Sequence, residues 1–231
     1  MSLLVVIPAR GGSKGLPGKN VKSLNGKPLI HYTIEEARKI FNDEQILIST
    51  ESPEIIEVAQ KTGIRVPYMR PEYLSTDTAR SEDVIKDAIL WYESKAEKVE
   101  TVVLLQPTSP FRKANHILEA LSIYDSSVEM VVSTKVSKSN PYFNLFEEDT
   151  KGFLTKVKHG FDYANRQECP PVFEYNGAIY IFDKNSFLAN GFRGFTRIKK
   201  YVMNDFSSID IDTSFDWAIA EMLLRDKYLE I

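Results

Sequence analysis

The sequence has almost no cysteine and very little histidine. Cys169 is the only cysteine among 231 residues, which excludes a disulfide framework and a zinc site built on several thiolates. The three histidines, His31, His116 and His159, are far apart and lack the spacing of metal ligands. A reducing, cytoplasmic compartment is the simplest expectation.

Long apolar runs and an excess of one charge are also missing. The opening apolar run, residues 3–7, is too short for a signal peptide, and no segment approaches the length that spans a membrane. A net charge of −3 argues against a nucleic-acid coat and against a membrane-surface protein. With 43% hydrophobic residues the chain can bury a full core, and we expect residues 1–231 to form a single domain.

The first twenty residues, LLVVIPARGGSKGLPGKN after Met-Ser, combine a predicted strand with a glycine-rich, purely basic loop. No acidic residue occurs before Glu35. The loop carries four glycines and three cations, namely Gly11, Gly12, Gly15, Gly18, Arg10, Lys14 and Lys19. Glycines let backbone N–H groups approach phosphate oxygens, and cations neutralise the remaining charge. We therefore favour a polyphosphate site over a merely solvated basic loop, although the spacing matches neither a P-loop nor a dinucleotide fingerprint.

Hydrophobic periodicity alternates between strand and helix along most of the chain. Ser52-Pro53 is a helix-start signal, and we expect Ser81 to cap the helix that follows it. The predicted strands are residues 3–7, 45–49, 65–69, 101–105, 130–136 and 178–182, and the predicted helices are residues 28–41, 53–62, 82–95, 115–124 and 215–228. This order is typical of an α/β fold with a mostly parallel sheet and covering helices.

A turn bracketed by prolines, QPTSPFR, follows the near-continuous apolar run 101–105. In open parallel sheets, ligands bind at the carboxyl ends of the strands. Gln106, Ser109 and Arg112 are therefore candidate ligand contacts. Taken alone, the sequence of this turn is equally typical of a turn that only ends the strand and binds no ligand.

Residues 137–171 lose the regular periodicity and are rich in aromatic side chains. Beta-type runs around residues 144–147 and 153–157 predict a hairpin that projects from the main sheet. Aromatic residues on a projecting arm more often bury against a partner subunit or the parent domain than bind a cofactor. We interpret residues 137–171 as a dimerisation arm inserted within the domain.

Two aspartates near the C-terminus lie two residues apart. In an extended chain Asp210 and Asp212 point to the same side, and paired carboxylates suit Mg²⁺. Thr213 and Asp216 form a predicted capping box for the last helix. The alternative to metal binding is therefore that Asp212 only caps this helix while Asp210 is solvated. Together with the cationic loop, the pair favours metal binding.

These pieces together resemble the acylneuraminate cytidylyltransferases, the CMP-sialic acid synthetase family. The resemblance rests on IPARGGSKGLPGKN (7–20), LLQPTSPFR (104–112), NRQ (165–167), NGAIYI (176–181) and SIDIDT (208–213), which occur in family order. It implies a three-layer α/β sandwich with a mixed, mostly parallel sheet and an arm that exchanges contacts in a homodimer. It also implies a transferase that joins CTP to the anomeric hydroxyl of a nonulosonic acid and releases pyrophosphate.

The resemblance implies a role for each candidate residue. Arg10, Lys14 and Lys19 would hold the triphosphate, beside Gly11, Gly12 and Ser13 of the same loop. Asn20, Arg70 and Ser81 would contact the cytidine moiety, and the sugar-acid side would be formed by Gln106, Ser109, Arg166, Asn176 and Tyr180. Asp210 and Asp212 would bind the catalytic Mg²⁺, with Lys19 and Arg10 as the catalytic cations.

Two positions depart from family members that act on N-acetylneuraminate. Those members can place basic residues where this chain has Glu174 and Phe143. A carboxylate at position 174 repels an anionic sugar acid. Either these positions do not correspond to the basic residues of the family, or the acceptor differs from N-acetylneuraminate. A deoxy, diacetamido acid such as legionaminic or pseudaminic acid is less polar and is expected to tolerate Phe143 better.

Three rival functions are weaker. A transferase for the eight-carbon acid Kdo shares the general chemistry, but the extended GGSKGLPGKN loop and the NGAIYI segment argue against it. Sugar-1-phosphate nucleotidyltransferases typically carry a different glycine-rich signature. A non-catalytic nucleotide-binding regulator needs no metal pair, yet both aspartates and all three loop cations are present.

Overall fold

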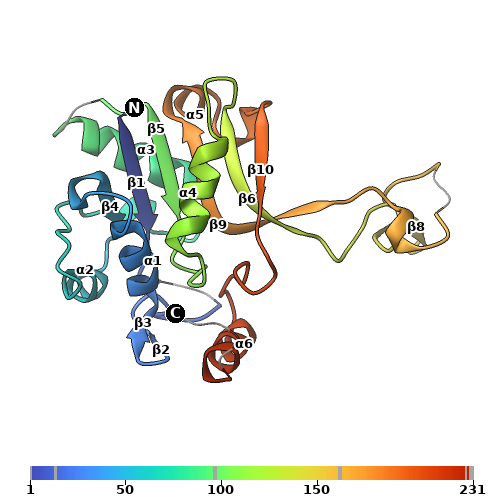
Figure 1. Ribbon diagram of the computed structural model, residues 1–231, viewed down its shortest axis with the longest axis horizontal. Helices are drawn as coiled ribbons and strands as arrows, with labels where there is room; N and C mark the ends of the chain where they lie inside the picture. The colour runs from blue at the N-terminus through green and yellow to red at the C-terminus, as the bar shows by residue number, and fades with distance from the viewer. Residues whose placement is uncertain (1, 13–14, 96–97, 161–162, 227, 229–231) are drawn as a thin grey trace.

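The computed structural model describes residues 2–12, 15–95, 98–160, 163–226 and 228. In this part of the chain six strands form one mixed sheet in the order β10-β6-β9-β5-β1-β4 (Figure 1). The strands are β1 (Leu3–Pro8), β4 (Ile46–Ser49), β5 (Thr101–Leu105), β6 (Met130–Val136), β9 (Phe173–Asp183) and β10 (Ile198–Val202). β9 runs antiparallel to β5 and β6, whereas the other neighbours are parallel. The expected α/β fold with a mixed, mostly parallel sheet is confirmed.

Helices cover both faces of this sheet because side chains alternate along its strands. In β1, Val5 and Ile7 face the core beneath α1, α2 and α4, whereas Leu4 and Val6 face α3 and α5. The helices are α1 (Leu29–Arg38), α2 (Pro53–Gln60), α3 (Ser81–Glu93), α4 (Ala114–Ile123), α5 (Lys184–Asn190) and α6 (Ser214–Arg225), with short 3₁₀ turns η1 (Asp43–Gln45), η2 (Glu72–Leu74), η3 (Arg166–Glu168) and η4 (Phe192–Gly194). Among the described residues, no helix combines the length and apolar character that crossing a membrane requires.

A third apolar cluster brings the two ends of the chain together. Leu16, from the glycine-rich loop, packs in one buried cluster with Ile211 and with Trp217 of α6. Leu24 joins the same cluster from the small hairpin of β2 (Ser23–Leu24) and β3 (Lys27–Pro28). The loop after β1 therefore lies against the segment that precedes α6. This packing places Lys19 beside Asp212.

Several predicted elements need correction. The predicted strand at residues 65–69 is absent from the described fold except for an isolated parallel bridge between Thr50 and Met69, because Pro67 has no N–H with which to continue a ladder. Ser81 is the first residue of α3, whose N-cap is Arg80 without a side-chain bond, so the predicted cap was wrong. Sequence reasoning also missed α5 and β10. The capping box of Thr213 and Asp216 at α6 is confirmed.

The predicted hairpin is present on a long projection from the sheet. β7 (Phe146–Glu148) pairs antiparallel with β8 (Leu154–Lys156), and Figure 1 shows this region extending well away from the sheet beyond β6 and β9. Phe153 and Leu154 are 67% and 68% exposed there. The segment therefore presents apolar side chains that its own chain does not cover.

Candidate active site

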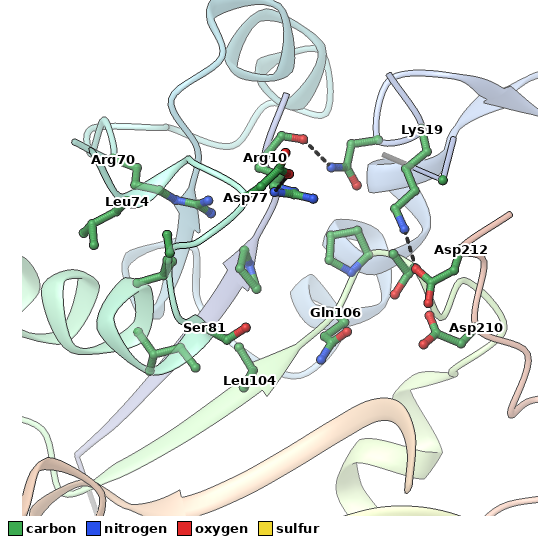
Figure 2. A pocket seen from close by; sticks show the side chains of 18 of the residues that line it. Arg10, Lys19, Arg70, Leu74, Asp77, Ser81, Leu104, Gln106, Asp210 and Asp212 are labelled. Atoms are coloured by element: carbon green, nitrogen blue, oxygen red, sulfur yellow. Dashed lines mark hydrogen bonds and ion pairs between the residues drawn. The ribbon is translucent and has the colours of Figure 1, made fainter. Parts of the chain in front are cut away.

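A main cleft with a volume of about 570 Å³ opens at the carboxyl ends of β1 and β5 (Figure 2). Its position follows the general rule for open α/β sheets. Residues with predicted roles come to it from five separate parts of the chain: Arg10, Lys19, Asn20, Arg70, Ser81, Gln106, Asp210 and Asp212. Residues nearly two hundred positions apart in the sequence thus face one space.

Lys19 links the glycine-rich loop directly to the predicted metal site. Its ammonium group donates to the Ile211 carbonyl and to Asp212 Oδ1, both at 2.8 Å, and its side chain is buried. Gly15 makes the approach possible, since a Cβ at this position would lie 2.3 Å from the Asp212 carbonyl oxygen. A cation and a carboxylate predicted from opposite ends of the chain are therefore in contact.

The two aspartates differ in environment although both line the cleft. Asp212 is 69% exposed, whereas Asp210 is largely enclosed and its buried Oδ1 has no hydrogen-bond partner. Burial raises the pKa of the Asp210 carboxyl, the neighbouring Thr108 hydroxyl and Lys19 lower it, and the negative charge of Asp212 raises it again, with a net upward shift. A buried carboxylate oxygen without a donor suits a hard cation, so the pair fits Mg²⁺ completed by phosphate oxygens. The described residues hold no cluster of three or more His, Cys, Asp or Glu side chains that could bind a metal.

Glu51 supports the glycine-rich loop and was missed by sequence reasoning. Its Oε1 accepts from the Gly11 N–H at 2.7 Å, and its Oε2 lies 3.8 Å from Arg70 Nη1. The Gly11 amide is thus already used within the protein. Among the described residues that line the main cleft, neither Gly11 nor Gly12 appears. Ser13 and Lys14 lie outside the described residues.

The other predicted nucleotide contacts lie around the cleft. Asn20 donates to the Arg10 carbonyl at 3.0 Å and keeps its buried Oδ1 without a partner. Arg70 is buried and donates to the side chain and carbonyl of Ser49, while burial lowers its pKa. Ser81 lies at the N-terminal end of α3, where the helix dipole favours negative charge. Each of these groups faces the cleft from a rigid support.

A second cleft of about 390 Å³ meets the first at Asp210. Glu174 lines it and pairs with Lys135 at 3.2 Å. Asn176 also lines it, but its amide is engaged: Oδ1 accepts from Ser133 Oγ at 2.6 Å and Nδ2 donates to Ser208 Oγ at 2.9 Å. The adjoining clefts provide room for two ligands that meet at one carboxylate.

The remaining predicted contacts are less directly placed. Gln106 lines the main cleft, and Ser109 is fully buried and donates to the Asn176 carbonyl at 3.4 Å. Tyr180, on β9, packs against Tyr175 and has its pKa raised to about 12 by burial and by the nearby Asp210. Arg166 lines neither cleft and instead donates to the Ser137 carbonyl at the base of the arm.

Arg112 is a structural residue, which corrects its interpretation as a ligand contact. Its side chain is almost completely buried. It donates to the carbonyls of Gln106 and Ala178 at 3.1 and 2.9 Å. Through these bonds the guanidinium fixes the turn that presents Gln106 to the cleft. Its burial lowers its pKa to about 9.

Comparisons with known proteins agree with this geometry. Residues 4–207 match the family described as Cytidylyltransferase. The chain is 39% identical over 229 residues to a CMP-N,N'-diacetyllegionaminic acid synthase of Legionella pneumophila, covering 97% of each protein. It is 38% identical over 221 residues to an N-acylneuraminate cytidylyltransferase of Streptococcus agalactiae, covering 94% of this chain and 52% of that protein. The structure of a CMP:2-keto-3-deoxy-manno-octonic acid synthetase complexed with CTP superposes with a TM-score of 0.70 and 17% identity, covering 98% and 100% of the two chains, which supports the fold.

Proposed function

The chain belongs to the cytidylyltransferase family, and on this premise we propose that it joins CTP to the anomeric hydroxyl of a nonulosonic acid and releases pyrophosphate. The observation that carries the proposal is the contact of Lys19 with Asp212, which places a phosphate-binding cation against the carboxylates in one cleft. The acceptor hydroxyl attacks the α-phosphorus while pyrophosphate leaves on the opposite side. Sialic, legionaminic and pseudaminic acids are the class of acceptor.

The protein's part in this reaction is to hold two anions together and to stabilise the charge that develops. Arg10 and Lys19 contact the phosphates, where fixed positive charge favours the departing pyrophosphate. Asn20, Arg70 and Ser81 position the cytidine moiety. Because Lys19, Asn20 and Arg70 are held by hydrogen bonds within the protein before the substrate arrives, these three groups need little reorganisation as the reaction proceeds.

Asp210 and Asp212 are the proposed ligands of Mg²⁺. When bound, the cation supplies Lewis-acid stabilisation of phosphate oxygens and lowers the pKa of an oxygen attached to it. The support is the orphaned buried Oδ1 of Asp210 and the opening of both clefts at this residue. Asp210 therefore holds a position at which it can orient the reacting groups of both substrates.

Replacing Gly177 with alanine should damage this carboxylate selectively. Gly177 has φ +74, and an added Cβ would lie 3.0 Å from Asp210 Oδ2. Gly26→Ala is the matched control, because Gly26 has φ +83 and nothing within 4 Å of the added Cβ. Backbone strain should lower the free energy of unfolding of each variant by about 1–2 kcal/mol. We expect only Gly177→Ala to lose most of the pyrophosphate release from CTP, and equal losses in both variants would contradict the proposed role of Asp210.

The acceptor is proposed to be a diacetamido acid of the legionaminic or pseudaminic type. In the second cleft Glu174 lies 3.2 Å from Lys135, so this cation is already paired within the protein. A deoxy, diacetamido acid has fewer hydroxyl groups and is less polar than N-acetylneuraminate, so we expect it to be tolerated better by a chain that has Glu174 and Phe143 where family members can have basic residues. The compared relatives act on both classes at similar identity, so identity alone does not choose between them.

A panel of acceptors tests both parts of this proposal, the transfer to a nonulosonic acid and the preference for a diacetamido acid. Pyrophosphate release from CTP should require a nonulosonic acid and should be fastest with a diacetamido acid. Preference for N-acetylneuraminate would overturn the acceptor class alone, whereas preference for Kdo would overturn the nonulosonic-acid function. No acid-dependent release with any acceptor would favour a nucleotide-binding regulator.

We also propose a homodimer formed through the arm. The exposed apolar side chains of the β7–β8 hairpin support it, because such patches commonly mark contacts between proteins. Arg166 lies on the arm and lines neither cleft of its own chain, so its implied contact with the sugar acid requires a partner's cleft. The mass in solution, measured by light scattering, should correspond to two chains, and a monomeric mass would contradict this part of the proposal.

A further inference from the structure

Arg10 already has a carboxylate partner within the main cleft. Its Nη1 lies 3.0 Å from Asp77 Oδ1, and both side chains line the cleft (Figure 2). The two residues are 67 positions apart, so the contact is set by the fold. The side chains are 35% and 47% exposed. Any phosphate oxygen bound by this face of Arg10 competes directly with Asp77.

Arg10 differs from the other cleft cations in how firmly it is held. Lys19 and Arg70 are buried, and each donates to a backbone carbonyl. The pair of Arg10 and Asp77 is partly exposed, and such pairs contribute little to stability. Among the cations of the cleft that the structure describes, Arg10 can therefore exchange partners at the lowest cost in free energy.

Asp77 belongs to a segment that separates two hollows. Residues 75–80 connect η2 to α3. Thr76 and Ala79 line both the main cleft and a separate hollow of about 500 Å³ on the protein surface. Because open space borders this segment on two sides, it can shift without disturbing a packed core. A change of partner at Asp77 is thus structurally easy.

We propose that Asp77 sets the affinity of the site for phosphates, by competing for Arg10 and recapturing it as pyrophosphate departs. This inference rests on the proposed function and deepens it. The cations that stabilise the leaving group also tend to retain the product, and product release limits the turnover of many enzymes. A carboxylate that competes for one cation weakens the hold on pyrophosphate while the deeper contacts of Lys19 remain.

The test is Asp77→Asn, measured by calorimetric titration with inorganic pyrophosphate at a fixed Mg²⁺ concentration and without acceptor. The variant should bind pyrophosphate about two- to fivefold more tightly, the range expected when a partly exposed ion pair no longer has to be broken. Asp83→Asn is the matched control. Asp83 lines the separate hollow of about 500 Å³ but not the main cleft, and its replacement removes the same charge as Asp77→Asn. It should leave the dissociation constant unchanged. Unchanged or weaker binding by Asp77→Asn, or equal tightening in both variants, would overturn the proposal.

A double-mutant cycle with Arg10→Gln identifies the route of the effect. If Asp77 acts through Arg10, Asp77→Asn should no longer tighten binding once Arg10 is replaced. Tightening that persists in the double variant would contradict competition for Arg10. The proposed function is tested separately, by acid-dependent pyrophosphate release from CTP in the wild-type protein: absence of that release would contradict the function, whereas the titrations of Asp77→Asn test only the competition for Arg10.

Discussion

Asp210→Asn should reduce Mg²⁺-dependent pyrophosphate release to background, a loss of about a thousandfold or more. Asparagine keeps the shape of the side chain but removes the charge that a divalent cation needs. Asp210 lines both clefts, so the loss of its charge affects the point that the two proposed ligands share. The measurement is pyrophosphate release from CTP and a nonulosonic acid across a Mg²⁺ titration.

Loss of activity in this variant should not come from unfolding. Because the pKa of Asp210 is raised in the folded protein, its ionisation at neutral pH costs folding free energy, and the amide removes this cost. The melting temperature should therefore stay level or rise. Asp43→Asn is the control, because Asp43 pairs with Arg38, lines neither cleft and should leave pyrophosphate release unchanged. Near-normal release by Asp210→Asn would refute the metal assignment.

Lys19→Met should lower turnover by about a hundredfold or more, the magnitude typical of a preorganised group that stabilises developing charge. Methionine is close to lysine in length and fits the buried path of the side chain, but it donates to neither Ile211 nor Asp212. The loss should appear mainly in kcat, because Arg10 and Arg70 still attract CTP to the cleft. Steady-state kinetics at varied CTP concentration measures how the loss is divided between kcat and the KM for CTP.

Lys22→Met is the matched control for Lys19. Lys22 lies three residues further along the chain, is exposed, and places its ammonium 4.3 Å from the centre of the Trp217 ring. Its replacement removes the same charge from the same region, and we expect activity to change less than about twofold. Comparable losses in both variants would show that general positive charge matters and that the specific contacts of Lys19 do not.

Short-range patterns in the sequence predicted the outline of the fold and part of the cleft, whereas Asn20, Arg70 and Ser81 were expected there only from the family resemblance. The strand at residues 101–105 and the capping box at α6 depend on neighbouring residues, and both are confirmed. Lys19 and Asp212 were predicted from separate local signals, and the packing of Leu16 with Ile211 brings them together. Their roles in binding and catalysis remain predictions.

Long-range contacts account for what the sequence could not predict. Glu51 supports Gly11 from 40 positions away, and no local pattern marks such a residue. β10 is largely exposed and pairs only along β6, so it lacks the apolar alternation of an inner strand. Arg112 gave a wrong expectation because a fully buried arginine is rare. Arg112 can be buried because its guanidinium donates to carbonyl groups of the neighbouring turn and of β9.

A crystal structure with CTP and Mg²⁺ tests the central claim most directly. The account predicts the triphosphate between the cations Arg10 and Lys19 and the carboxylate of Asp210, with Asp77 released from Arg10. CTP bound in another part of the molecule, or with its phosphates directed away from both Lys19 and Asp210, would contradict the account.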